Sequence, residues 1–173
     1  GVLALMCDST NAERPGFTPS EKTVGKTFDT LFADHKNTRI FVATFASNVD
    51  RVQQIINTAY KFGRKVVVEG RSMVSIIDTA SKLGYLNIPD KTLIDVDQLK
   101  NYPDEQQVII TTGSQGESMA ALSRMASNMH KKITIGAGDT VIFSSNPIPG
   151  NEKAVTKVIN ELFRKGADVI FQD

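Results

Sequence analysis

Two loops rich in small and polar residues give this sequence its clearest chemistry, which is the binding of an anion. The first loop, residues 111–116, follows a short apolar run and leads into a helical pattern that opens at Glu117. A strand, a small-residue loop and a helix start together bind phosphates, because free backbone N–H groups and the helix dipole attract an anion. The candidate binding residues of this loop are Gly113, Ser114, Gln115, Gly116 and Glu117.

The same stretch also fits a helix start that needs no ligand. Ser114 and Glu117 have the spacing of a capping box, in which each side chain bonds the backbone N–H of the other residue. The run is neither GxGxxG nor GxxxxGK followed by Ser or Thr, so it carries no standard nucleotide-binding motif. Anion binding and helix capping both stay open for this loop.

The second loop, residues 144–152, holds two prolines and a glycine in a serine-rich run before another helical pattern. Its hydroxyl and N–H groups could cradle an anion, whereas Gly150 or Asn151 could simply cap the helix that follows. The two loops converge if they leave neighbouring strands of one sheet. The candidate binding residues here are Ser144, Ser145, Gly150, Asn151 and Glu152.

Asp8 is the residue whose position best suits a metal ion. It follows a predicted strand, where a carboxylate can bind a cation or can close an Asx turn. The chain has two histidines, His35 and His130, which are too few for a self-contained multi-histidine site. We expect His130, which precedes two lysines, at the surface, and Cys7 inert in the core.

The charge balance gives no general affinity for polyanions. The 173 residues carry a net charge of +1, so a nucleic-acid site must be local. The single cysteine suits a reducing compartment such as the cytoplasm, and no apolar run approaches the roughly 20 residues of a membrane span. Arginines near predicted loop ends could contact phosphate or could be solvated, and these are Arg14, Arg51, Arg71 and Arg124.

Short apolar runs alternate with amphipathic patterns along most of the chain. Strands are expected at residues 2–7, 40–45, 66–68, 93–96, 108–110, 133–135, 141–143 and 168–171. Helices are expected at residues 18–33, 49–62, 73–83, 117–126 and 153–165. Continuous apolar strands separated by helices are typical of a mostly parallel sheet covered on both faces. We therefore expect one α/β domain over residues 1–173, a three-layer α/β/α fold of Rossmann-like type, with ligands beyond the carboxyl ends of the strands.

Five motifs, in order along the chain, resemble those of bacterial ribonuclease J, and more narrowly those of its β-CASP domain, which is inserted into a metallo-β-lactamase fold. They are CDSTNAERPG at 7–16, FASN at 45–48, VEGRS at 68–72, TGSQGE at 112–117 and SSNPIPGNE at 144–152. The resemblance covers essentially the whole chain. Because the sequence begins at Gly1 with an apolar run and ends on another, we expect a piece of a longer polypeptide.

The resemblance implies a zinc-dependent ribonuclease with endonuclease and 5′→3′ exonuclease activity in cytoplasmic RNA processing and decay. It implies a dimer or tetramer that binds single-stranded RNA with a 5′-monophosphate, in a cleft between the two domains. Asp8 matches the zinc-bridging aspartate, and the two loops match those that face the RNA end and its backbone. Residues 1–16 and 168–173 would then lie near the junctions to the metallo-β-lactamase domain.

The chain lacks the HxHxDH motif of the family, so the fragment alone is expected to hold no zinc and to be inactive. Asp50 stands where members often carry His, and Ser118 where they often carry Pro; we assign Asp50 no role in RNA binding. Two alternatives stay open. One is a nucleotide- or phosphate-binding α/β domain without a nuclease role, and the other is a structural or dimerising insert whose loops only cap helices.

Overall fold

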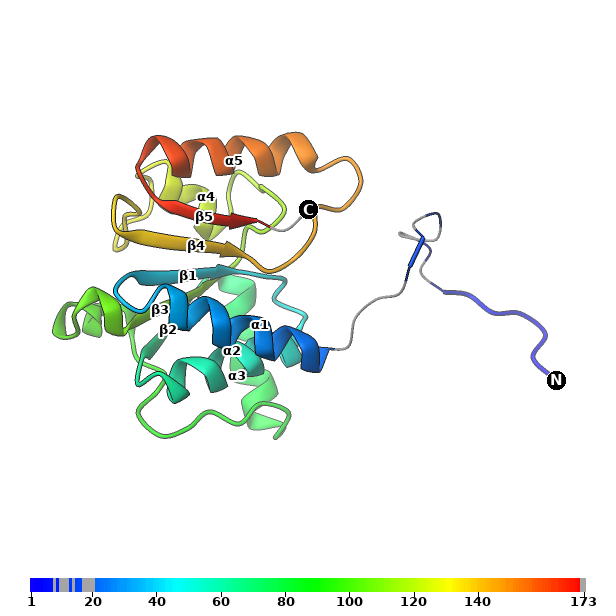
Figure 1. The fold of residues 1–173 in the computed structure, drawn as a ribbon. Coiled ribbons are helices and arrows are strands. Elements are labelled where there is room, and N and C mark those ends of the chain that lie inside the picture. The colour runs from blue at the N-terminus through cyan, green and yellow to red at the C-terminus, as the bar shows by residue number, and fades with distance from the viewer. Residues whose placement is uncertain (8, 10–12, 14, 17–20, 172–173) are drawn as a thin grey trace.

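A five-stranded, entirely parallel sheet in the order β2-β3-β1-β4-β5 organises the computed structural model (Figure 1), which describes all residues except 8, 10–12, 14, 17–20 and 172–173. The strands are β1 Arg39–Ala43, β2 Lys65–Glu69, β3 Gln107–Thr111, β4 Asp139–Phe143 and β5 Asp168–Phe171. The helices are α1 Glu21–Asp34, α2 Val49–Lys61, α3 Arg71–Lys82, α4 Ala121–Ala126 and α5 Glu152–Arg164. Two short 3-10 helices, Val96–Asn101 and Asp104–Gln106, precede β3.

The sheet separates two hydrophobic clusters, which confirms the predicted three-layer α/β/α fold. On β1, Ile40 and Val42 face the cluster beneath α1, α2 and α3, whereas Phe41 and Ala43 face the cluster beneath α4 and α5. Neighbouring strands continue this alternation, because Phe41 is paired with Ile109 on β3 and with Val141 on β4. Both faces of the central strands are therefore buried from solvent, which explains why their sequences are continuous apolar runs.

Three predicted strands are wrong, and one of them, at residues 93–96, is reduced to a single bridge between Leu93 and Val66 beside β2. Residues 2–7 form no strand in the structure and are exposed, Cys7 included, because an apolar run makes a strand only where a partner strand offers its backbone groups. Ile133 and Ile135 are 2% and 1% exposed, but they fill the cluster beneath α4 and α5 from an irregular segment. Burial without pairing gives the same apolar pattern as a strand.

Some large apolar side chains are exposed instead of facing the core. Tyr60, Val74, Leu83 and Phe163 lie in their helices or directly after them, and Met119 lies in the connection before α4. α1 begins at Glu21 in the structure, and residues 18–20, the predicted start of this helix, lie outside the described residues. Within the part of the chain that the structure describes, no helix is long and apolar enough to span a membrane.

A buried ion pair fixes β1 against β4 at the amino end of the sheet. Arg39 donates from its Nε to Asp139 Oδ1 and from a terminal nitrogen to Asp139 Oδ2, each at 2.8 Å. The second oxygen also accepts the backbone N–H of Gly136 at 2.8 Å, and Arg39 donates to the carbonyl of Thr134. The Asp139 side chain is 5% exposed, so the ion pair and these hydrogen bonds replace water around it.

We expect Asp139→Ala to lower the free energy of unfolding by about 3 kcal/mol, because it leaves the Arg39 guanidinium without its buried partner. Denaturant unfolding of the 173-residue chain measures this change. Asp78→Ala is the matched control, since Asp78 pairs with Lys82 where both side chains are at least 60% exposed. The control should cost less than about 0.5 kcal/mol, and equal losses from the two variants would contradict the assignment.

Candidate functional site

Three connections converge at the carboxyl edge of the sheet because β3, β1 and β4 are adjacent and parallel. Hydrogen bonds continue the pairing just beyond the strands, from Thr44 N–H to the Thr111 carbonyl at 3.1 Å and from Ser144 N–H to the Ala43 carbonyl at 2.9 Å. The two predicted anion loops therefore leave β3 and β4, with β1 between them. We call them the β3 loop, residues 112–120, and the β4 loop, residues 144–151.

The β3 loop does not start a helix at Glu117, as the sequence predicted. α4 begins at Ala121 and has six residues, and its cap position, Ala120, has no side-chain hydrogen bond. The Glu117 carboxylate instead accepts the backbone N–H of Gln115 at 3.1 Å. The Ser114–Glu117 capping box is therefore wrong, and so is the argument from a helix dipole, because the chain makes a turn from Gly113 to Gly116 before any helix forms.

Gln115 joins the β3 loop to the β4 loop. Its side-chain amide donates from Nε2 to the carbonyl of Asn146 at 3.0 Å. Its Oε1 accepts the backbone N–H of Ile148 at 2.7 Å and Asn151 Nδ2 at 3.2 Å. The residue is 5% exposed, so the structure places it between the loops and not on their outer surface.

Gly116 brings the β3 loop against the first turn of α5. A Cβ atom built there would lie 2.3 Å from the carbonyl carbon of Ala154 and 2.5 Å from the N of Val155. Its φ of 74° also lies in the left-handed region, which glycine adopts at low cost. The close approach therefore explains this glycine by packing against a helix, and not by the approach of a ligand.

The β4 loop is held at its start by Arg51 from the first turn of α2. Arg51 donates to the carbonyl of Ser144 and, at 2.7 Å, to Ser144 Oγ. At the end of the loop, the Glu152 carboxylate accepts the backbone N–H of Gly150 at 2.9 Å. Asn151 occupies the N-cap position of α5 but makes no side-chain cap bond, because its amide is turned toward Gln115.

The ten predicted loop residues thus lie together but differ in what they can touch. Gly113, Ser114 and Gln115 are buried, so these residues do not contact a ligand in this conformation. The half-buried members are Gly116, Ser144, Ser145 and Asn151, and the exposed members are Glu117, Gly150 and Glu152. The Ser145 Oγ is shielded from solvent and has no hydrogen-bond partner in the structure as described.

The prediction that His130 lies at the surface is wrong, because its side chain is buried against Glu69 at the carboxyl end of β2. Its side chain is 7% exposed, and its Nε2 lies 3.2 Å from Glu69 Oε2. Its Nδ1 accepts the backbone N–H groups of Lys132 and Ile133, which leaves Nε2 as the donor to Glu69. Sequence patterns missed this pair and the Arg51–Ser144 contact, since the partners are far apart in the chain.

The described residues do not form a metal site. No group of three or more His, Cys, Asp or Glu side chains within them is placed to bind an ion. His35 is engaged by the carbonyl of Leu31 and by Asp168 at the amino end of β5. Asp8, the predicted zinc ligand, lies outside the described residues, so the structure does not test that role.

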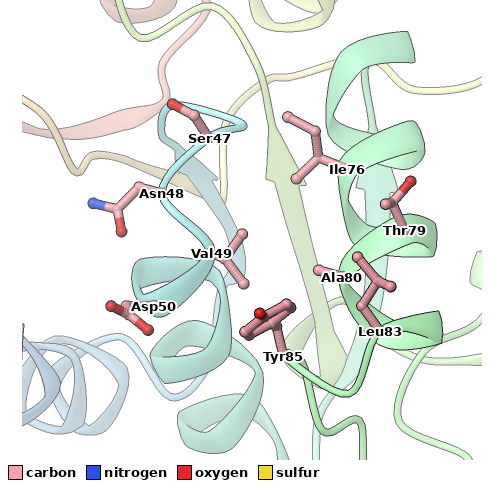
Figure 2. A pocket seen from close by; sticks show the side chains of 9 residues that line it. All are labelled: Ser47, Asn48, Val49, Asp50, Ile76, Thr79, Ala80, Leu83 and Tyr85. Atoms are coloured by element: carbon pink, nitrogen blue, oxygen red, sulfur yellow. The ribbon is translucent and has the colours of Figure 1, made fainter.

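A groove of about 470 Å³ begins beside the carboxyl edge and runs between α2 and α3. Figure 2 shows Val49 of α2 turned toward Tyr85 and toward Ala80 of α3, with Leu83 just past the end of that helix, whereas Asp50 points away from them. The groove is mainly apolar, and Asp50 lies at its rim, outside the two loops.

Fold and site together define a class: a parallel three-layer α/β domain that presents cross-linked loops of small residues at the carboxyl edge of its central strands. A family model described as "Ribonuclease J, beta-CASP domain" matches residues 37–162. The chain belongs to the ribonuclease J family, and the part of that family it represents is the β-CASP domain.

Relatives from distant bacteria are similar along almost the entire chain. Ribonuclease J2 of Bacillus subtilis is 49% identical over 172 residues, which are 99% of this chain and 31% of the relative. Ribonuclease J of Synechocystis and ribonuclease J of Thermus thermophilus are each 50% identical over 171 residues, or 99% of this chain and 27% and 30% of the relatives. The chain therefore spans less than a third of the length of these proteins.

Gly116→Ala should lower the free energy of unfolding by about 3 kcal/mol, because the new methyl group meets the α5 backbone and the left-handed φ is also strained. Gly63→Ala is the control, with a φ of 67° and no atom within 4 Å of the added Cβ. It should cost only about 1 kcal/mol. Chemical denaturation of the two variants measures the difference, and equal losses would show that packing against α5 does not constrain this position.

Proposed function

We propose that this chain is the RNA-binding domain of a zinc-dependent ribonuclease that hydrolyses RNA phosphodiester bonds in RNA processing and decay, as both endonuclease and 5′→3′ exonuclease. The observation that carries the proposal is the convergence of the β3 and β4 loops at one edge of a chain that belongs to the ribonuclease J family. The substrate is single-stranded RNA, with a 5′-monophosphate end facing these loops.

The chemistry of the two loops supports a polyanionic ligand. They offer hydroxyl groups, backbone N–H groups and a nearby guanidinium, that of Arg51, without a broad basic surface. Such groups position a phosphate backbone and are indifferent to base sequence. Specificity for particular RNAs would then come from elsewhere in the enzyme.

The metal chemistry would belong mainly to other parts of a longer polypeptide. We propose Asp8 as a zinc-bridging ligand, with the remaining ligands in a metallo-β-lactamase domain joined near residues 1–16 and 168–173. Bound zinc would activate a water molecule to attack the phosphodiester. The residues of this chain would bind and orient the RNA toward that centre, in a cytoplasmic enzyme that forms a dimer or tetramer.

The 173-residue chain alone should show no zinc-dependent RNA cleavage, because it carries two histidines and both are engaged within the fold. Incubation of labelled single-stranded RNA with the chain and added zinc tests this expectation. Cleavage that persists through repurification and is abolished by a chelator would overturn it. Tight, saturable binding of a mononucleotide would instead favour the alternative of a nucleotide-binding domain.

Ser145→Ala in the full-length enzyme should weaken RNA binding severalfold without lowering the melting temperature. The Ser145 hydroxyl has no hydrogen-bond partner among the described residues, and because it is shielded from solvent in this conformation, the proposed complex would supply a partner through a shift of the β4 loop on RNA binding. Ser81→Ala is the control, because Ser81 Oγ is also buried without a partner but lies in the last turn of α3. Unchanged RNA affinity in both variants would remove Ser145 from the interface, and a purely structural insert predicts that activity follows stability in each.

A further inference from the structure

We propose that Gln115 is a positioning residue: its hydrogen bonds hold the β3 and β4 loops together in one RNA-binding surface, and it affects RNA affinity without contacting RNA. The inference rests on the proposed function of the two loops, and it assigns Gln115 a role different from the direct contact that the sequence predicted. Its basis is that the Gln115 amide bonds three residues of the β4 loop, with both lone pairs of Oε1 and one donor of Nε2 used inside the fold.

The Gln115 side chain has no capacity left at its acceptor. The two lone pairs of Oε1 are taken by Ile148 N–H at 2.7 Å and Asn151 Nδ2 at 3.2 Å, while Nε2 donates to the Asn146 carbonyl at 3.0 Å. With 5% of the residue exposed, RNA cannot reach this amide unless the loops separate. Gln115 therefore acts on a ligand only through the loops that it joins.

The composition of the β4 loop makes this cross-link necessary. Pro147 and Pro149 have no backbone N–H, so Ile148 carries the one N–H donor of the Pro147–Pro149 stretch, and that donor is used by Gln115. Asn146 and Asn151, on either side of this stretch, bond to the same amide. One side chain thus organises three points of a loop that has few hydrogen bonds of its own.

The other end of the cross-link is rigid. The backbone N–H of Gln115 donates to Glu117 Oε2 at 3.1 Å, and Gly116 is packed directly against the α5 backbone. Arg51 separately holds the start of the β4 loop at Ser144. Loss of the Gln115 amide would therefore release residues 146–151 while leaving the beginning of the loop in place.

The expected consequence is a change in binding and not in folding. Asn146 and Ile148 are exposed, so water can satisfy the groups that Gln115 leaves, and the two hydrophobic clusters contain neither residue. The released loop would sample several conformations, and RNA binding would have to order it again. The KM for RNA should rise, whereas kcat should change little because the reacting centre is not altered.

The test compares Gln115→Ala with Gln107→Ala in the full-length enzyme, using a single-stranded RNA with a 5′-monophosphate. Gln107 is the matched control at the other end of β3: it is 4% exposed and donates to the carbonyls of Leu99 and Tyr102, away from both loops. We expect Gln115→Ala to raise KM about tenfold, since a displacement of positioning groups by about 1 Å costs up to about 100-fold. Gln107→Ala should leave KM unchanged even if it lowers the melting temperature equally.

Gln115→Glu provides a second measurement that remains informative if the alanine variant does not fold. An ionised carboxylate cannot donate to the Asn146 carbonyl, whereas a protonated carboxyl group can replace the lost amide donor. Burial raises the pKa of a carboxyl group, so Glu at this position gains its proton as the pH is lowered. The RNA dissociation constant of Gln115→Glu, divided by that of the unsubstituted enzyme at the same pH, should therefore decrease as the pH is lowered from about 8 to about 5.

The outcomes separate this inference from the proposed function. An unsubstituted enzyme that does not bind RNA overturns the proposed function and the inference together. An enzyme that binds RNA, but with the same KM in Gln115→Ala and no pH-dependent recovery in Gln115→Glu, overturns the inference alone. Equal increases of KM in Gln115→Ala and Gln107→Ala would show a general effect of destabilisation, which also contradicts it.

Discussion

The parallel pairing of β1 with both β3 and β4 is the constraint on which the rest of the structure depends. Because β1 lies at the centre of the sheet, all three strands end at the same edge, and the connections that follow them must meet there. The Arg39–Asp139 pair fixes this register from the opposite end. The chemistry at the carboxyl edge is therefore positioned by strands whose own residues are buried and apolar.

The sequence predicts the layers well because they depend on patterns that are local. Continuous apolar strands and amphipathic helices with glycine at their ends identified each strand of the sheet and each helix, as at Gly63, which follows α2 and has a φ of 67°. Local patterns fail where an apolar run is not both buried and hydrogen-bonded to a partner strand. Ile133 and Ile135 are buried without a partner strand, and residues 2–7 are apolar without being buried in the structure as described.

The site is predicted in its location but not in its internal roles. Small residues after β3 and β4 indicated the correct edge, yet the sequence cannot show that Gln115 turns inward to the β4 loop or that Gly116 meets Ala154. These contacts join residues more than thirty positions apart. Several of the residues that indicated a ligand are instead used within the fold: Gln115 and Asn151 join the two loops, and Gly116 packs against α5. The loop surface is therefore set by buried residues as much as by exposed ones.

The topology also makes some pairings of the sheet long-range and others local. Residues paired between β1 and β4, such as Arg39 and Asp139, are 100 positions apart, whereas β4 and β5 are joined through α5 alone. Closing a long chain segment costs more entropy than closing a short one, so the pairing of β1 with β4 is entropically more costly to form than the pairing of β4 with β5. During synthesis, a chain that has not yet formed its central pairings would expose the apolar edges of β3 and β4, and this is the stage at which it would be most prone to aggregate.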